Sequence, residues 1–172
     1  RTDLPLLETG RAQAEALRPV LTQLIAERSP LGAGAPVVFT SPLARALATA
    51  ELAMPEAEAE PTHLLAEVDY GRYEGLRIDE IREDDPTWNV FVNGGPEGEN
   101  VHQVAARCES FIAKLERVAA GRVAVAFTHG HFSRMLTARM LGLHAAAGES
   151  LWNDTGSVGV IEQRRSALVL TG

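Results

Sequence analysis

The stretch Val123–Arg134, VAVAFTHGHFSR, constrains the fold of this chain more than any other segment. Its apolar run predicts a buried strand that ends just before His129, where a glycine and a helix follow. Ligands of open α/β sheets bind outside the carboxyl ends of the strands, which is where this pattern places His129. Gly130 allows the backbone to turn tightly, and the N–H groups that begin the helix attract an anion. The segment therefore indicates phosphate chemistry that uses a histidine.

Strands and helices alternate along the rest of the chain. We predict strands at 35–40, 62–65, 123–128, 158–162 and 167–170, and helices at 9–28, 43–53, 78–82, 86–92, 101–115 and 132–141. This alternation is typical of an α/β fold, a three-layer sandwich whose mainly parallel sheet carries helices on both faces. The last two strands are close enough in sequence to form a hairpin at an edge.

Local signals place the beginnings of the first two long helices. Thr9 is predicted as an N-cap, and Pro19 falls inside the helix that follows, where it can introduce a kink. Ser41 is predicted to cap the helix at 43–53, with Pro42 in its first turn. The acidic, proline-containing stretch 54–61 is predicted to be a loop, as is the glycine-rich stretch 93–100.

Size and composition limit the function classes. A length of 172 residues predicts one domain over residues 1–172. The net charge of −7 argues against a nucleic-acid partner, so an anionic substrate needs a local cationic pocket. No apolar run approaches the roughly 20 residues that span a bilayer, and the single Cys108 gives no sign of an oxidising compartment. We therefore expect no membrane partner and a cytoplasmic location. The sequence leaves open whether the protein forms a homodimer.

The segment TSPLAR places a cation near a predicted strand end. Arg45 falls on the first turn of the helix that follows the strand, close to the carboxyl edge of the sheet. A guanidinium fork at this position can hold phosphate oxygens. The alternative is an ordinary surface arginine.

The segment EVDYGRYEG carries carboxylates directly after a predicted strand. If Glu67 is partly buried, its acid form is favoured and it can donate a proton to a leaving oxygen. The alternative is a solvated acidic turn that also includes Asp69. Glu74, further along the segment, is predicted to be a structural partner rather than a catalyst.

His129 and His131 differ in their expected roles. A histidine that ends a buried strand favours function, whereas His131 can simply cap or pack at the start of the helix. The spacing of the two histidines also fits a metal pair. No third ligand is evident, because Cys108 falls on the apolar face of its helix, so we expect no metal.

Five segments in order resemble the histidine phosphatase family, also called the phosphoglycerate mutase-like family. They are DLPLLETGRAQAEAL, TSPLARALATAELA, LLAEVDYGRYEGL, GGPEGENVHQVAAR and FTHGHFSRML, and together they run the length of the chain. Each motif alone is weak, whereas five in the expected order and spacing form a strong signal.

The resemblance implies a division of labour for phosphomonoester hydrolysis through a phosphohistidine intermediate. Arg45 and His129 would hold the phosphoryl group of a small-molecule phosphomonoester, and Glu67 would be the proton donor. No metal or organic cofactor is required. Further substrate contacts are expected from Thr2, Asp69, Tyr70 and Asn153.

The chain departs from the family pattern at two points. Leu7 stands where the family has Thr or Ser, which leaves Thr9 as the substitute cap. The family's Arg-His-Gly signature, whose histidine is the nucleophile, has no counterpart in residues 1–172. We expect a segment upstream of residue 1 to supply the first strand and the nucleophile, and without them the sheet should show a gap or an exposed edge. A truncated or degenerate protein is the alternative.

Two other functions stay open. A true phosphoglycerate mutase would use the same pocket, but committed mutases resemble one another in a long insertion, and only about 20 residues separate Gly75 from Pro96 here. A non-catalytic phosphate-binding module that has lost its nucleophile would retain the fold, although a pure binder needs no proton donor. The physiological substrate is also open, since Tyr73, Trp88 and Phe91 could contact an apolar alcohol or pack within a lid.

Overall fold

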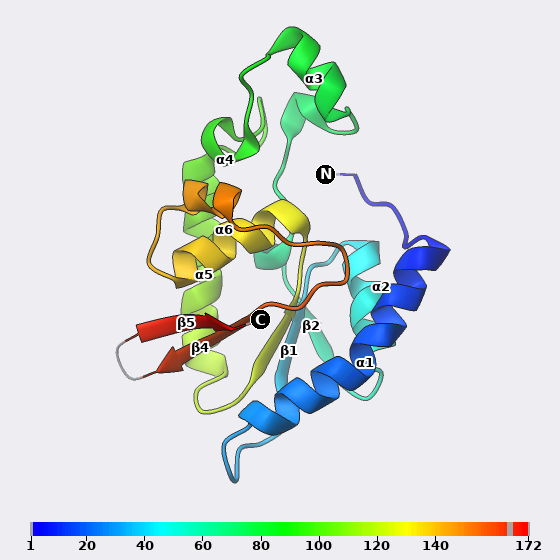
Figure 1. Cartoon of the computed structure of the whole chain (residues 1–172), viewed down its shortest axis with the longest axis vertical. Coiled ribbons are helices and arrows are strands. Elements are labelled where there is room, and N and C mark those ends of the chain that lie inside the picture. The colour runs from blue at the N-terminus through cyan, green and yellow to red at the C-terminus, as the bar shows by residue number, and fades with distance from the viewer. Residues whose placement is uncertain (1, 165–166, 172) are drawn as a thin grey trace. The chain divides into compact units, whose positions relative to one another are not determined.

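The computed structural model describes residues 2–164 and 167–171. They form two compact units, which we call the sheet unit (residues 3–66 and 110–129) and the helical unit (Thr2 with residues 67–109 and 130–171) (Figure 1). No helix in the described ranges combines the length and apolar character that crossing a bilayer requires.

The sheet unit is built on three parallel strands in the order β2-β1-β3. The central strand β1 (Val37–Thr40) pairs with β2 (Ala59–Pro61) on one side and with β3 (Ala124–Phe127) on the other. Its residues are almost wholly buried, as the apolar sequence VVF predicts. The predicted α/β class with a mainly parallel sheet is confirmed.

Helices cover both faces of this sheet. Side chains alternate along β1, so Phe39 faces Phe111 of α5 (Val101–Val118), with ring centroids 5.6 Å apart and edge to face. Thr40 faces the other side, where α2 (Ala44–Ala53) packs. The long helix α1 (Glu8–Arg28) packs on α2 (Figure 1). The predicted helix–sheet–helix layering is therefore present in this unit.

Both edge strands of the sheet, β2 and β3, have a single partner within the described residues. β3 bonds to β1 and to no other described strand, and its residues Ala124 and Ala126 are exposed although the run is apolar. A strand of small apolar residues with an exposed edge is a site for further strand pairing. The sheet therefore has an exposed edge at β3, and the expected strand from an upstream segment stays a prediction.

The second predicted strand is misplaced by a few residues. We predicted 62–65, but β2 is Ala59–Pro61, within the stretch predicted as loop, and a 3₁₀ helix η1 covers His63–Leu65. Pro61 is compatible with the strand because β2 has β1 as its only partner in the described sheet. The Thr62 hydroxyl then accepts a hydrogen bond from the Leu64 N–H at 3.4 Å, which begins the 3₁₀ turn.

Two predicted helix starts are also wrong. α1 begins at Glu8 with Leu7 as its N-cap, so Thr9 lies inside the helix, and the helix continues through Pro19. The helix predicted at 86–92 is only α4 (Val90–Asn93), because the Asp85 carboxylate accepts hydrogen bonds from Thr87 and holds a turn there. The Asn89 side chain caps α4 by accepting from the Phe91 N–H at 2.9 Å.

The helical unit packs the first half of α5 with α6 (Gly130–Met140). Val104 and Cys108 of α5 and Phe132 and Met135 of α6 are fully buried. Burial raises the pKa of the Cys108 thiol to about 12, so this cysteine behaves as a core residue. The unit also contains α3 (Ile78–Asp84), the 3₁₀ helices η2 (Gly71–Tyr73) and η3 (Ala145–Ser150), and the predicted hairpin, in which β4 (Val160–Arg164) pairs antiparallel with β5 (Ala167–Thr171).

Backbone contacts lock the glycine-rich loop 94–98 against the turn that starts at Asp69. The Glu99 N–H donates to the Asp69 carbonyl, and the Arg72 N–H donates to the Pro96 carbonyl, both at 2.9 Å. A Cβ on Gly98 would lie 2.2 Å from the Asp69 carbonyl oxygen. Only glycine allows this approach, and the contact fixes the segment that follows Glu67.

We predict that Gly98→Ala lowers the free energy of unfolding by about 2 kcal/mol, since the added methyl must push backbone apart. Urea or thermal unfolding measures the effect. Gly159→Ala is the matched control, because a Cβ at Gly159 meets no atom within 4 Å. Equal stability of the two variants would show that the loop contact is not tight.

Candidate active site

The ends of two neighbouring strands bring Ser41 and His129 together. Thr40 of β1 pairs with Phe127 of β3, and the Ser41 N–H extends the ladder by donating to the Phe127 carbonyl at 2.9 Å. His129 lies two residues beyond β3, and its Nε2 is 2.7 Å from the Ser41 Oγ. Ser41 is fully buried and His129 is 8% exposed. The parallel register therefore positions an imidazole at the carboxyl edge of the sheet, as the sequence predicts.

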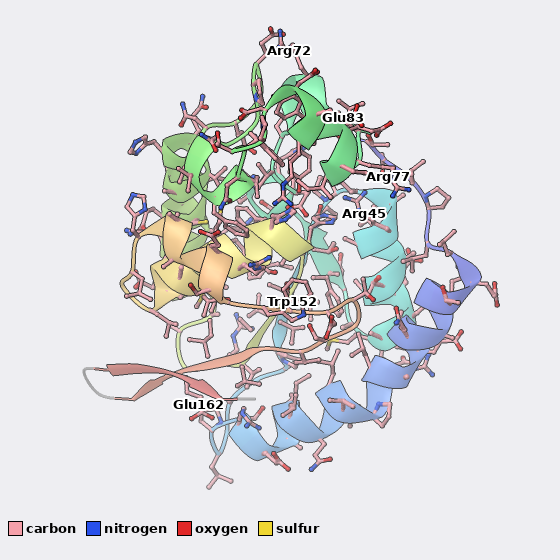
Figure 2. All side chains as sticks on the ribbon, turned by 45° about the horizontal axis from the view of Figure 1, so that its top comes forward. Arg45, Arg72, Arg77, Glu83, Trp152 and Glu162 are labelled. Atoms are coloured by element: carbon pink, nitrogen blue, oxygen red, sulfur yellow. The ribbon has the colours of Figure 1, made fainter. Side chains whose placement is uncertain are left out.

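Arg45 lies on the first turn of α2, which follows β1 in the same unit (Figure 2). The helix begins at Ala44, so Ser41 and Pro42 precede it and the predicted N-cap position of Ser41 is wrong. The Ser41 hydroxyl still accepts from the Leu43 N–H at 3.3 Å. The Asp3 carboxylate accepts from the Ala44 N–H at 2.8 Å, a contact that no local pattern predicted. Asp3 thus caps the helix that carries Arg45.

Glu67 lies in the helical unit, where its carboxylate accepts hydrogen bonds from the beginning of α6. Oε1 accepts from the Phe132 N–H and from the Val68 N–H, both at 2.9 Å, and Oε2 accepts from the His131 N–H at 3.3 Å. Glu67 is half-buried, as the sequence analysis supposed. These three backbone donors fix the position of the Glu67 carboxylate at the beginning of α6.

A buried ion pair that sequence reasoning missed supports the Glu67 segment. Arg107 of α5 donates from Nε and from a terminal nitrogen to the two oxygens of Glu99, each at 2.8 Å. The same guanidinium donates to the Glu67 carbonyl at 3.3 Å and lies 4.1 Å from the ring centroid of Phe132. Glu99 in turn accepts from the Asp69 N–H at 3.0 Å. The eight-residue spacing of Glu99 and Arg107 carries no helix-pair signal, so only the fold reveals their contact.

The predicted substrate contacts are engaged in protein contacts. The Asp69 carboxylate accepts from the Gly71 N–H at 3.0 Å, and Asn153 donates to the Ser133 hydroxyl at 2.7 Å. Thr2 donates from its N–H and hydroxyl to Glu74, at 2.9 and 3.0 Å. Burial opposes ionisation of Glu74, but its hydrogen bonds from Tyr70 and Thr2 outweigh burial and lower its pKa. Glu74 is therefore a hydrogen-bond acceptor for Thr2 and Tyr70, and its expected role as a structural ion-pair partner rather than a catalyst stays a prediction.

His131 is packed rather than presented as a metal ligand partner of His129. Its Nδ1 is 2.6 Å from the Tyr70 hydroxyl, and its ring lies edge to face against Tyr70 and Phe91. Burial lowers the pKa of His131, and Arg134 acts in the same direction while the Glu67 carboxylate opposes it. Among the described residues, no three His, Cys, Asp or Glu side chains gather where they could share a metal ion.

The aromatic residues of the predicted lid pack on one another. Tyr73 and Trp88 lie edge to face with centroids 5.3 Å apart, and the buried Trp88 donates from Nε1 to the Gly94 carbonyl at 2.9 Å. Phe91 is buried, and the Arg134 guanidinium lies over its ring, 4.3 Å from the ring centroid. Trp88 and Phe91 are therefore buried in the helical unit, and Tyr73 is half-buried against Trp88, as expected if these rings pack within a lid.

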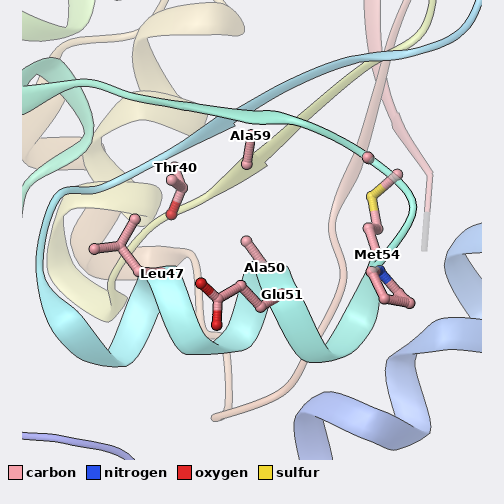
Figure 3. A pocket seen from close by; sticks show the side chains of 8 residues that line it. Thr40, Leu47, Ala50, Glu51, Met54 and Ala59 are labelled. Atoms are coloured by element: carbon pink, nitrogen blue, oxygen red, sulfur yellow. The ribbon is translucent and has the colours of Figure 1, made fainter.

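A separate pocket of about 390 Å³ lies between α2 and the strands of the sheet unit (Figure 3). Its lining is formed by Thr40, Leu47, Ala50, Glu51, Met54, Pro55, Ala57 and Ala59. The lining includes a carboxylate and no basic side chain, so it does not suit a phosphate. Neither Arg45 nor His129 lines it.

The sequence predictions therefore divide between the two units. Arg45 and His129 belong to the sheet unit, where His129 contacts Ser41 after the neighbouring strand. Glu67, Asp69 and Tyr70 belong to the helical unit, where α6, α5 and the glycine-rich loop hold them.

Comparison with known proteins gives a consistent result over the whole chain. An acid phosphatase of Mycobacterium tuberculosis is 41% identical over 159 residues, which cover 92% of this chain and 74% of that protein. The solved structure of the open reading frame Rv3214 from Mycobacterium tuberculosis superposes with a TM-score of 0.89 at 37% identity, covering 99% of this chain and 84% of the other.

A more distant solved structure has the same fold. It is a mycobacterial glucosyl-3-phosphoglycerate phosphatase, with a TM-score of 0.78 at 25% identity over 98% of this chain and 87% of the other. Residues 1–171 match the sequence profile of the histidine phosphatase superfamily, branch 1. The match includes every segment in which the sequence analysis found a motif, and it supports a phosphatase activity. The chain therefore belongs to the histidine phosphatase superfamily.

Proposed function

We propose that this protein hydrolyses small phosphomonoesters through a phosphohistidine intermediate. Arg45 and His129 hold the phosphoryl group, Glu67 is the proton donor, and the nucleophilic histidine lies upstream of residue 1. The observation that carries the proposal is the contact of His129 Nε2 with the Ser41 Oγ, 2.7 Å apart at the carboxyl ends of two parallel strands. Ligands of α/β sheets bind at this edge.

The sheet unit supplies the groups that stabilise the transferred phosphoryl group. His129 is held by Ser41 in a buried position, so its imidazole is oriented before substrate binds. Arg45 follows on the first turn of α2 and offers a planar pair of donors that matches phosphate oxygens. One preorganised donor of this kind is worth about 3–4 kcal/mol in the transition state.

The chemistry needs one proton donor that also acts as a base. The nucleophilic imidazole forms a bond to phosphorus while the ester P–O bond breaks, and the leaving alkoxide takes a proton from Glu67. The Glu67 carboxylate then takes a proton from the water that attacks phosphorus, and the P–N bond breaks to release phosphate.

Hydrolysis is favoured over mutase activity by the short connection after the Glu67 segment. Only about 20 residues separate Gly75 from Pro96, and they fold back as α3 and α4 on the helical unit. The loss of a nucleophile is not needed to explain the chain, since Glu67 is held by three N–H donors in a way that a pure phosphate binder does not require.

We predict that Glu67→Gln in the full-length protein slows hydrolysis of alkyl phosphates about 100-fold or more, as loss of a general acid does. Hydrolysis of 4-nitrophenyl phosphate, whose leaving group needs no proton, should fall much less. Steady-state kcat/KM values for both substrates test this, with the exposed Glu116→Gln as the matched control. Equal slowing of both substrates would remove Glu67 from the acid role.

We predict that His129→Ala reduces turnover below one hundredth of the wild-type value, on the scale of one lost oxyanion donor. His129→Asn keeps a polar group in the buried site and should be as inactive as His129→Ala. Circular dichroism and thermal unfolding show whether either variant has a folding defect. His63→Ala, at an exposed position, is the control. Near-normal turnover in the two folded His129 variants would overturn the phosphate site.

An assay on 3-phosphoglycerate separates hydrolysis from mutase chemistry. We expect the full-length protein to release phosphate from 4-nitrophenyl phosphate and to form no 2-phosphoglycerate. Isomerisation of 3-phosphoglycerate at a rate comparable with phosphate release would establish the mutase instead, and no reaction with either compound would favour a binding module.

A further inference from the structure

His131 is a polar ring of the helical unit whose fixed geometry the catalytic roles above do not use. Its Nδ1 is 2.6 Å from the Tyr70 hydroxyl, and its ring is held edge to face by Tyr70 and by Phe91. Phe91 is in turn covered by the Arg134 guanidinium, 4.3 Å from its centroid. The imidazole therefore cannot rotate freely, and the direction of its second nitrogen is set by its neighbours.

The second nitrogen has no partner within the part of the chain that the structure describes. The hydrogen bonds of His131 there are those of its Nδ1 and its backbone N–H. Nε2 is also not sealed from solvent, because the buried side-chain atoms without a partner among these residues do not include it. A half-buried ring thus presents one unused polar atom to the outside.

The contact with the Tyr70 hydroxyl favours one of the two neutral tautomers of the imidazole. Burial disfavours the imidazolium and lowers the pKa of His131, so the ring is neutral near pH 7 and has one N–H. A phenol is a better donor than a neutral imidazole, and an imidazole nitrogen is the better acceptor. Tyr70 therefore donates to Nδ1, which leaves the proton on Nε2. The unused atom is a hydrogen-bond donor.

This donor lies next to the proposed proton donor. The Glu67 carboxylate accepts from the backbone N–H of His131 itself and from that of Phe132. An alcohol oxygen that receives a proton from Glu67 therefore lies within a few ångströms of the residue that carries the imidazole.

We propose that His131 is a substrate contact that selects for polar alcohols, its Nε2–H donating a hydrogen bond to a hydroxyl or carbonyl oxygen of the leaving group. Tyr70 is the positioning residue that fixes the tautomer. The inference rests on the proposed function, since it takes Glu67 as the group that protonates the leaving oxygen. It assigns the specificity to polyol or hydroxy-acid phosphates rather than to alkyl or aryl phosphates.

The test compares two substrates that differ only in hydroxyl groups, glycerol 3-phosphate and propyl phosphate, in the full-length protein. We expect the wild-type ratio of kcat/KM values, glycerol 3-phosphate over propyl phosphate, to exceed one. His131→Phe, which keeps a ring between Tyr70 and Phe91, should reduce this ratio about three- to tenfold, the scale of one neutral hydrogen bond. His131→Gln places an amide N–H at a similar reach and should restore part of the ratio.

Two controls separate recognition from structure. His102→Phe, at an exposed position on α5, should leave the ratio at the wild-type value. In wild-type protein with ¹⁵N-labelled histidine, we expect His131 to carry its proton on Nε2, and Tyr70→Phe should remove that preference and lower the ratio. A wild-type proton on Nδ1 would overturn the proposal.

The outcomes distinguish this inference from the proposed function. If the wild-type enzyme hydrolyses both substrates and His131→Phe leaves their ratio unchanged, His131 does not contact the alcohol and the inference is wrong. If His131→Phe and His131→Gln slow both substrates by the same factor, the residue is only structural and the inference is also wrong. If the wild-type protein hydrolyses neither substrate nor 4-nitrophenyl phosphate, the proposed function itself is wrong.

Discussion

The parallel pairing of β1 with β3 is the constraint on which the candidate phosphate site depends. The register that places Thr40 beside Phe127 also places Ser41 and His129 just beyond the same edge of the sheet. Because side chains alternate along a strand, a slip of one residue would turn Phe39 away from Phe111 and toward the face that α2 covers. Core packing and the position of the histidine are therefore set by the same register.

In the helical unit, the Glu67 carboxylate is held at the beginning of α6. Three backbone N–H groups bind Glu67, and the Arg107–Glu99 pair holds the backbone around it. The glycine loop then leaves no room for a side chain against Asp69. The position of the Glu67 carboxylate is therefore set by backbone groups and by contacts from segments that are distant in sequence.

The parts of the site that the sequence predicted are those whose signal is local. His129 and Arg45 each follow a short apolar run, and that pattern alone locates a strand end. The missed parts join residues that are distant in sequence, such as Asp3 with the N-terminus of α2 and Glu99 with Arg107. The misplaced second strand has the same cause, because Pro61 is tolerated only where β2 has a partner on one side, and this depends on the strand order.

The sequence by itself determined the α/β class, the strand ends that carry chemistry and the superfamily, because hydrophobic periodicity and motif order are properties of the chain. Only the tertiary structure decided that Ser41 holds His129, that α6 binds Glu67 and that Tyr70 fixes His131. Hydrogen bonds between distant segments depend on ångström-scale positions, and packing and strand register, which no local pattern encodes, set those positions.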